Sequence, residues 1–502
     1  MEFILNSKEM QDADSYTIKN FTPSLELMEK AGTECYKVIL PYINKSNNIL
    51  VACGSGGNGG DGLVIARLLL ENGFNPTVCM IGSHLKNETK TNFERYKGKI
   101  IQNIDNFKSD DFDIIIDSAL GVGINCALKD NYISFINKLN TLNGFKVSID
   151  ISSGIDSTSG NSLGAFFKSD LTIAINNYKT GHYFNDGIES YNRLIKVDIG
   201  ISLLENHEYT KTLNLMDFCS LFPKRNRNSN KGNNGRVALI GGCKLTPGAL
   251  NLSLNALAAL RGGVGYATVC IPSSLYNIYA LKNNENIYQL LSDDDGKIVF
   301  NEKEISKLLN YDAIAIGMGI GTSEEVYKII KFLLANYNGN LLIDADGLNS
   351  ISKFGIDILN KHSCNVILTP HLKEFSRLSG LSLDDIKLNY IDVAKAFANK
   401  YHVYLNLKND VSVITDGNEV ILNINGNPGL AKGGSGDVLS GVTLSLLNKK
   451  DNLLYRVACG AFILGRSSDF AIKDINEYSL MARDLSKYLI SVFNELVGTK
   501  AK

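Results

Sequence analysis

The chain has 502 residues, a formal net charge of -1, 44% hydrophobic residues and 21% charged residues. This length predicts about two to three domains, and the composition is ordinary for a globular protein. The near-neutral charge argues against a general nucleic-acid-binding surface, and no apolar run reaches the roughly 18 residues that a membrane helix needs.

The first residues and the cysteines predict a cytoplasmic protein. The segment MEFILNSKEMQDADS has neither a basic region nor a long apolar core, so we expect no signal peptide. The nine cysteines are scattered without a C-x-x-C pair, which favours neither a zinc site nor a disulfide framework.

Residues 1–212 are predicted to form the first domain, because short apolar strands alternate there with helical patterns. The strand Ile49–Cys53 is followed by GSGGNGGDG at residues 54–62 and by a helix expected to begin at Leu63. Further strands are predicted at Pro76–Ile81, Phe112–Asp117, Lys146–Ile151 and Leu171–Ile175. This alternation predicts a Rossmann-like α/β domain of three layers, helices on both faces of a parallel sheet.

The glycine loop at residues 54–62 matches the pattern G-x-G-x-x-G only weakly as a dehydrogenase signature. The next predicted strand ends in VCMIGSHLK, without the acidic residue that would hold a ribose, and no Walker lysine follows the glycines. We therefore expect the loop to bind a phosphate or nucleotide, but not for ordinary hydride transfer.

Polar side chains are predicted at the carboxyl ends of several strands of this domain. They are Asn58, Asp61, Asp117 and Asp150. Each alone is more often a loop-capping residue than a ligand. Their joint placement on the carboxyl edge of one sheet favours a ligand site.

The segment ENHEYTKT at residues 205–212 is polar and has no periodicity, so the domain boundary is predicted after residue 212. The basic run that follows, Lys224 to Arg236, is interpreted as a solvated connector in preference to a phosphate clamp.

Residues 213–502 are predicted to form a second α/β domain. Its strands are expected at Val237–Ile240, Tyr266–Ile271, Ala313–Ile316, Leu341–Asp344, Val366–Leu368, Val411–Thr415 and Glu419–Ile424. Polar clusters follow several of them, among them DADGLN, TPHLKEF and LKND. Asp346 and Glu374 are candidate carboxylates for Mg²⁺, which proteins usually hold through one or two carboxylates together with phosphates and water. His371 alone would be interpreted as a satisfied loop histidine.

The stretch NGNPGLAKGGSGDVLSGV, residues 425–442, is predicted to be a loop that enters a helix. The backbone N–H groups of Gly434, Ser435 and Gly436 would point into one concavity, where the helix dipole favours phosphate oxygens. Asp437 beside them would take a proton from a hydroxyl that attacks phosphorus. A bare GxGD is equally compatible with a capped helix start.

The motifs GNGGDG, DSALGVG, IDISSGID and NYKTGH resemble, in order, those of the NAD(P)H-hydrate epimerase domain. The resemblance implies K⁺ ligands at Asn58, Asp117 and Ser153, with Asp117 or a neighbour serving the proton chemistry. It also implies these substrate contacts: Gly57, Asn58, Gly59, Gly60, Asp61, Gly121, Val122, Gly123, Ile124, Asn125, Cys126, Ala127 and Asp150. Ser152 and Thr180 lie where the family usually has proline. The loss of these prolines would make this backbone more flexible.

The second half is similar to the ADP/ATP-dependent NAD(P)H-hydrate dehydratases of the ribokinase-like fold. The matching motifs are KGNNGRV, PGA, GMGIG, IDADGLN, TPHLKEF, LKND and NPGLAKGGSGDVLSG. The resemblance implies substrate contacts at Ala249, Gly319, His371 and Asp437. It implies nucleotide contacts at Lys408, Asn409, Asp410, Val411, Ser412 and Gly436. Asn409 departs from the usual glycine, and Met318 and Ile320 depart from the common GPGLG.

Together these resemblances identify the chain as a member of the bifunctional NAD(P)H-hydrate repair family. They imply that the first domain, with K⁺, interconverts the R and S hydrates of NADH and NADPH. The second, with Mg²⁺ and ADP, dehydrates the S form and releases AMP and phosphate. They also imply a homo-oligomer, and the charge and hydropathy predict no nucleic-acid or membrane partner. Two alternatives stay open: a first half that only binds a nucleotide, and a second half that is a vitamin or sugar kinase.

Overall fold

The computed structural model describes residues 1–257, 262–281 and 286–498. The chain divides into two compact units: the first spans Phe3–Tyr209, and the second consists of Met1–Glu2 and Thr210–Lys502. Both units are built from strands that alternate with helices, so the predicted α/β class is confirmed. Within the described part of the chain, no helix is long and apolar enough to cross a membrane.

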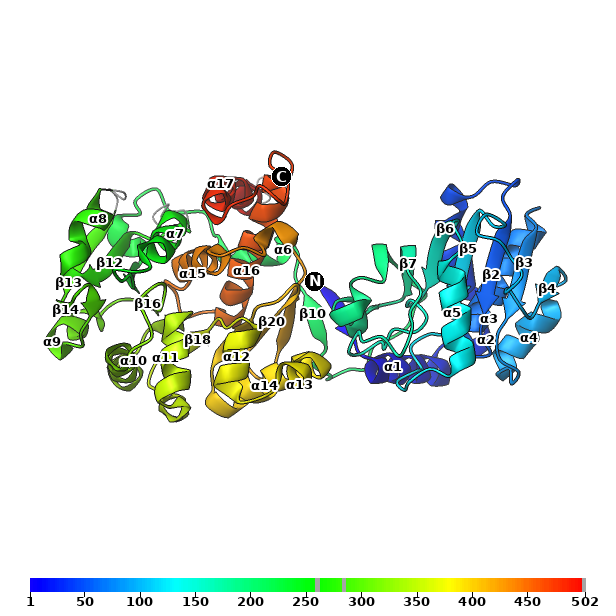
Figure 1. Cartoon of the computed structure of the whole chain (residues 1–502), viewed down its shortest axis with the longest axis horizontal. Helices are drawn as coiled ribbons and strands as arrows, with labels where there is room; N and C mark the ends of the chain where they lie inside the picture. The colour runs from blue at the N-terminus through cyan, green and yellow to red at the C-terminus, as the bar shows by residue number, and fades with distance from the viewer. Residues whose placement is uncertain (258–261, 282–285, 499–502) are drawn as a thin grey trace. The chain divides into compact units, whose positions relative to one another are not determined.

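The first unit has a sheet of parallel strands in the order β4-β3-β2-β5-β6-β7-β9 (Figure 1). Its strands are β2 (Ile49–Cys53), β3 (Pro76–Met80), β4 (Lys99–Ile101), β5 (Ile114–Ser118), β6 (Phe145–Ile149), β7 (Ser169–Ile175) and β9 (Tyr191–Val197). Its helices are α1 (Ser7–Asn20), α2 (Ser24–Ile39), α3 (Gly57–Glu71), α4 (Asn87–Arg95) and α5 (Asp130–Asn140). Apart from this sheet, β1 (Glu2–Leu5) pairs in parallel with β8 (Tyr178–Lys179).

Alternation along β2 explains the three layers of this unit. Ile49, Val51 and Cys53 pack in the core that contains α1, α2 and α3, whereas Leu50 and Ala52 pack in the core that contains α5. Successive strand side chains point to opposite faces, so a continuous apolar run is what a sheet covered on both sides requires.

The helix after the glycine loop begins at Gly57 and not at Leu63 as predicted. The segment GNGGDG is therefore the first turn of α3. Glycine has a poor helix propensity, but close packing overrides it here. A Cβ at Gly59 would lie 1.8 Å from the carbonyl oxygen of Gly54, and one at Gly62 would lie 2.7 Å from the Cβ of Ser118.

The second unit has a sheet whose strands follow the order β13-β12-β11-β16-β17-β18-β19-β20-β21-β10. Its strands are β10 (Thr210–Thr212), β11 (Arg236–Ile240), β12 (Tyr266–Pro272), β13 (Ile287–Leu291), β16 (Ala313–Ile316), β17 (Asn340–Ile343), β18 (Asn365–Leu368), β19 (Tyr404–Leu407), β20 (Ser412–Thr415) and β21 (Val420–Asn423). A separate antiparallel pair is β14 (Asp293–Asp294) and β15 (Lys297–Ile298). The pairs β19·β20 and β20·β21 are antiparallel, and the other pairs of the sheet are parallel.

Helices cover both faces of this second sheet (Figure 1). One face carries α7 (Pro247–Leu257), α15 (Ser435–Leu446), α16 (Leu453–Ala471) and α17 (Ala482–Gly498), whose apolar side chains share one core with β11, β12 and β16. The other carries α10 (Glu324–Asn336), α11 (Asp346–Phe354), α12 (Leu372–Ser379), α13 (Leu383–Leu388) and α14 (Tyr390–Tyr401). The remaining short helices are α6 (Leu215–Phe218), α8 (Tyr276–Ala280) and α9 (Glu302–Ile305).

Candidate active sites

The first candidate site lies at the carboxyl ends of β2, β5 and β6, where the strand order reverses between β2 and β5. The first turn of α3 meets this edge. Its N-cap, Gly56, makes no side-chain capping hydrogen bond, and a Cβ at Gly56 or Gly57 would meet no atom within 4 Å. The backbone N–H groups at this helix start are thus open to an anion.

Asn58, Asp117 and Ser153, the predicted cation ligands, come together at this edge. The hydroxyl of Ser153 donates to Asp117 Oδ1 at 2.6 Å, and its backbone N–H donates to Asp117 Oδ2 at 2.8 Å. Burial raises the pKa of Asp117 to about 6, although the hydrogen bonds from Ser153 favour the charged form.

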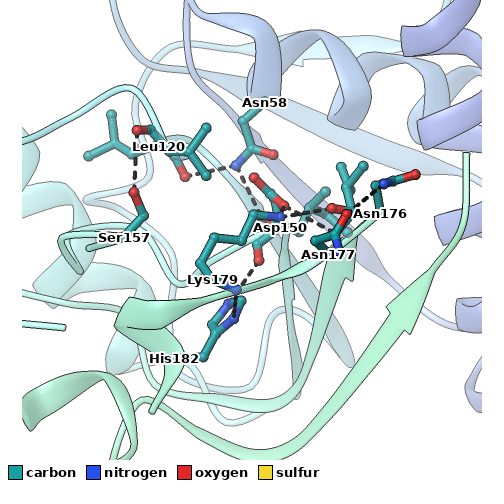
Figure 2. Close-up of polar contacts among 11 residues, drawn as sticks. Asn58, Leu120, Asp150, Ser157, Asn176, Asn177, Lys179 and His182 are labelled. Atoms are coloured by element: carbon teal, nitrogen blue, oxygen red, sulfur yellow. Dashed lines mark hydrogen bonds and ion pairs between the residues drawn. The ribbon is translucent and has the colours of Figure 1, made fainter. Parts of the chain in front are cut away.

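Asn58 supplies an unpaired oxygen to the same place. Its Nδ2 donates to the carbonyl oxygens of Leu120 at 2.8 Å and Ile149 at 3.1 Å, so these acceptors fix the orientation of the amide (Figure 2). Its Oδ1 is buried and has no hydrogen-bond partner among the described residues. A buried orphan acceptor is costly unless something binds it, so this oxygen suits a cation.

A buried lysine and histidine complete the first site, and both were absent from the predicted site residues. Lys179 is fully buried and forms an ion pair with Asp150, and its ammonium also donates to the carbonyl of Ile175 at 2.8 Å (Figure 2). His182 Nδ1 accepts from the backbone N–H of Lys179 at 3.0 Å, so its Nε2 carries the proton and donates to the carbonyl of Asp150 at 3.0 Å. The motif NYKTGH, which contains both residues, was the available signal.

Two further carboxyls share the electrostatic environment of this lysine. Burial raises the pKa of Asp61 well above its usual range, and Asp150 and Asp14 raise it further while Lys179 opposes them. Burial also raises the pKa of Asp14, from α1. Burial lowers the pKa of His182 to about 3, so its imidazole is neutral and acts as a positioning group.

The backbone of Asp150 is itself unusual, with φ of 69°. A left-handed conformation at a non-glycine residue is uncommon and tends to occur at functional sites. It places the carboxylate so that Oδ1 accepts from the backbone N–H of Ile175 at 3.1 Å as well as from Lys179.

The two positions without the family proline are anchored by side-chain hydrogen bonds. The hydroxyl of Thr180 donates to the carbonyl of Thr158 at 2.8 Å, and that of Ser152 lies 3.2 Å from the hydroxyl of Ser148. Both residues are buried. The expected loosening is therefore offset by local contacts.

The predicted substrate loop Gly121–Ala127 follows β5 and borders Asn58. A Cβ at Gly121 would lie 3.0 Å from the Cβ of Asn58, so glycine allows the loop to approach the first turn of α3. The side chain of Ser7 donates to the carbonyl of Val122 at 2.5 Å. Gly123, Asn125, Cys126 and Ala127 are exposed.

The second candidate site is built around the first turn of α15. Gly434 is its N-cap with φ of 100°, and no side chain caps the helix there. Asp437 lies in this turn, and its carbonyl accepts from the hydroxyl of Ser253 on α7 at 2.8 Å. The predicted glycine-rich helix entry is thus present.

The carboxyl group of Asp437 has a pKa near neutral pH. Burial raises its pKa to about 7, Asp344 raises it further, and Lys408 opposes the shift. Lys408 Nζ lies 3.0 Å from Asp344 Oδ1, and the hydroxyl of Ser440 donates to Asp344 Oδ2. Ser440, on α15, was not predicted.

The other predicted substrate residues fall beside this cluster. A Cβ at Gly319 would lie 2.9 Å from the Cβ of Ala249, so these two residues are in contact. His371 caps α12, because its Nδ1 accepts from the backbone N–H groups of Lys373 at 3.1 Å and Glu374 at 3.2 Å. Because Nδ1 accepts these hydrogen bonds, the proton of the neutral imidazole is on Nε2, which lies 3.6 Å from Glu374 Oε1. Burial lowers the pKa of His371.

The predicted nucleotide residues form the turn between β19 and β20. Lys408 is half-buried, Asn409 and Asp410 are exposed, Val411 is buried, and Ser412 begins β20. A Cβ at Gly436 would lie 3.3 Å from Lys408 Nζ, which links this turn to α15. The basic run from Lys224 to Arg236, in contrast, leads into the amino end of β11. That end lies at the opposite edge of the sheet from the loops after β16 and β17.

Carboxylates suited to a divalent cation border the same site. Asp346 Oδ2 accepts from the backbone N–H of Gly321 at 2.9 Å, and Glu374 Oε2 accepts from that of His371 at 2.9 Å. Among the described residues, no three His, Cys, Asp or Glu side chains converge to hold a metal by themselves. Mg²⁺ commonly takes phosphate oxygens and water as its other ligands.

The two sites define a class of protein: a two-unit α/β enzyme with an uncapped, glycine-rich helix start at the carboxyl edge of each sheet. Comparison with known families agrees. Residues 237–491 match the model of the family described as NAD(P)H-hydrate dehydratase, and residues 24–181 match that of the YjeF-related protein N-terminus.

Relatives match along nearly the whole chain. A bifunctional NAD(P)H-hydrate repair enzyme from Hyperthermus butylicus is 30% identical over 489 residues, covering 94% of this chain and 88% of that protein. One from Moorella thermoacetica is 29% identical over 518 residues, covering 98% and 97%. A solved ADP/ATP-dependent NAD(P)H-hydrate dehydratase from Bacillus subtilis is 26% identical, with a TM-score of 0.49, and covers 57% of this chain and 98% of that one. The chain belongs to the family of bifunctional NAD(P)H-hydrate repair enzymes.

Proposed function

We propose that this chain repairs hydrated NADH and NADPH, epimerising the R and S hydrates in the first unit and dehydrating the S hydrate in the second. The observation that carries the proposal is Asp437, a carboxylate with a pKa of about 7 beside an uncapped helix start. A base next to an anion site fits phosphoryl transfer to a hydroxyl group.

Dehydration would begin when Asp437 takes the proton of the C6 hydroxyl, whose oxygen attacks the terminal phosphorus of the nucleotide. The new O–P bond forms as the bond to the bridging oxygen breaks, so ADP would leave as AMP. The N–H groups at the start of α15 stabilise charge on the transferred group. The ring nitrogen then expels phosphate from C6, and loss of the C5 proton restores the dihydropyridine ring.

Epimerisation needs a proton donor and acceptor at C6, and we assign this role to the pair Lys179 and Asp150. The pair would protonate the departing hydroxyl, which leaves as water when the ring nitrogen donates its electrons. Water then adds to the opposite face of C6 and returns its proton to the pair. Asp117 is less suited to this work, because both its carboxylate oxygens accept hydrogen bonds from Ser153.

Two cations fit these sites. K⁺ would be held by Asn58, whose Oδ1 has no hydrogen-bond partner among the described residues, with Asp117 and Ser153, and would supply positive charge beside the substrate. Mg²⁺ would be held by Asp346 and Glu374 together with nucleotide phosphates, whose charge it would neutralise. ADP as the donor, a homo-oligomeric state and a cytoplasmic location stay predictions from the sequence.

The kinase alternative is not favoured, because the relatives that span both units are repair enzymes. A kinase would release a stable phosphorylated product, whereas a dehydratase would release free phosphate. The two reactions can therefore be separated by their products.

The test supplies the purified chain with mixed R and S hydrates of NADPH, Mg²⁺, K⁺ and ADP, or ATP in parallel. The absorbance of the reduced ring is followed with the wild type, Asp437→Asn and Lys179→Met. We expect full recovery with the wild type, none with Asp437→Asn, and recovery that stops at the S fraction with Lys179→Met. No recovery with either nucleotide would refute the repair function, and wild-type recovery that stops at the S fraction would refute the epimerase.

A further inference from the structure

A cavity opens in the first unit, beside the candidate epimerase site but on different strands. It has a volume of about 700 Å³ and lies where β3 and β4 end, next to the start of α5. Met80, Phe93 and Phe135 give it apolar walls, and Asn103, Asp105 and Asn131 give it polar ones. This volume and this mixture of walls are typical of small-molecule sites.

The place of the cavity in the sheet indicates what it would hold. In doubly wound folds with the strand order seen here, a dinucleotide lies across the carboxyl edge with its pyrophosphate at the start of the helix after the first strand. Here that helix is α3, and Asp150 follows β6. Three strand spacings separate β3 from β6, or roughly 14 Å. A dinucleotide whose nicotinamide ring is at Asp150 and whose pyrophosphate is at α3 therefore directs its adenosine toward the end of β3.

The cavity borders the glycine loop at this end of the sheet. Gly82, which lines it, packs so closely on the loop that a Cβ there would lie 3.0 Å from the hydroxyl oxygen of Ser55 and 3.1 Å from that of Tyr132. Ser55 belongs to the loop that leads into α3. The cavity and the glycine loop before α3 are thus neighbours.

Asp105 distinguishes an adenosine with a free ribose diol from one with a 2′-phosphate. It is the only charged residue among the described residues that line the cavity. A carboxylate accepts hydrogen bonds from a ribose diol and repels a 2′-phosphate. The strand β3 itself ends without an acidic residue, so the acid that such folds place there comes instead from the loop after β4.

We propose that this cavity is the adenosine subsite of the epimerase unit, and that Asp105 makes it select the hydrate of NADH over that of NADPH. This assignment rests on the proposed function, and it names the end of the substrate that the site distinguishes.

The test measures epimerisation alone, with no ADP or ATP present so that the dehydratase is idle. Purified S hydrates of NADH, NADPH and reduced nicotinamide mononucleotide are each converted to the R form, and initial rates are followed by chromatography. Asp105→Asn is compared with Asp110→Asn, a substitution of a nearby exposed aspartate that does not line the cavity.

We expect Asp105→Asn to raise KM for the NADH hydrate about tenfold and to leave kcat within twofold, since the ribose hydroxyls would donate to a neutral amide oxygen in place of a charged carboxylate. KM for the NADPH hydrate should stay the same or fall, and the mononucleotide, which has no adenosine, should be unaffected. Asp110→Asn should change none of these values.

Equal changes with the mononucleotide, or an unchanged ratio of KM for the two dinucleotides, would overturn the subsite while epimerisation by the wild type still stands. A wild type that epimerises neither dinucleotide hydrate would overturn the proposed function, and the assignment with it.

Discussion

Replacing Asp437 by asparagine should stabilise the second unit while abolishing dehydration. Burial raises the pKa of this carboxyl from 3.8 to about 7, so its charged form is disfavoured in the folded protein. Because the folded pKa is above the unfolded one, the stability contributed by the protonated form is fully present below pH 4 and is lost as the pH rises through 7. At about 1.4 kcal/mol per pKa unit, three units correspond to a loss of about 4 kcal/mol between pH 4 and pH 8.

Asparagine cannot ionise, so the variant should not show this loss. At pH 8 we expect the free energy of unfolding of Asp437→Asn to exceed that of the wild type by up to about 4 kcal/mol. At pH 4 the two free energies should differ little. Unfolding of the second unit by urea, at both pH values, measures the effect. Asp392→Asn, which changes an exposed aspartate on α14, is the control. A wild type and a variant with the same pH dependence would show that the carboxyl is not held at a raised pKa.

Three further outcomes are expected. In the wild type, kcat/KM for dehydration of the S hydrate should fall about tenfold per pH unit below pH 7, as the base Asp437 becomes protonated; a flat profile would remove it from that role. Lys179→Met should reduce epimerisation at least a hundredfold and destabilise the first unit by about 3–5 kcal/mol, because Asp150 is left buried without its partner, whereas dehydration of the S hydrate continues. Gly54→Ala should prevent stable folding of the first unit, since its Cβ would lie 1.8 Å from a backbone carbonyl oxygen. Gly57→Ala, whose Cβ would meet no atom within 4 Å, should fold normally and lose epimerase activity. Thermal melts and epimerisation rates test this pair, and equal melting temperatures of the two variants would contradict it.

The strands of the two sheets could largely be predicted because each is a short apolar run covered on both faces. Ile49–Cys53 and Ala313–Ile316 have the predicted bounds, since nothing but burial decides them. The strand β19, which pairs in parallel with β18 and antiparallel with β20, was missed. Its sequence, YLNL, places the buried Asn406 within a four-residue strand, and its pairing with β20 depends on a turn of polar residues.

The candidate sites were predictable where one segment carries the signal. Asp437 and the glycines before it lie in one helix start, and Asp117 lies near the end of one strand, β5. Lys179 and Ser440 were missed for a common reason: their partners Asp150 and Asp344 are distant in the sequence. Packing of the folded chain, not the local pattern, puts a lysine beside a carboxylate.

The left-handed backbone at Asp150 restricts how this position can be probed. Alanine there would remove the carboxylate together with its hydrogen bonds to Ile175 and Lys179, and the strain of the left-handed backbone, about 1–2 kcal/mol, would lose that compensation. Asparagine tolerates the left-handed region and changes only the charge. An alanine scan would therefore overstate the chemical importance of this side chain, and the position is open to few residues besides aspartate, asparagine and glycine.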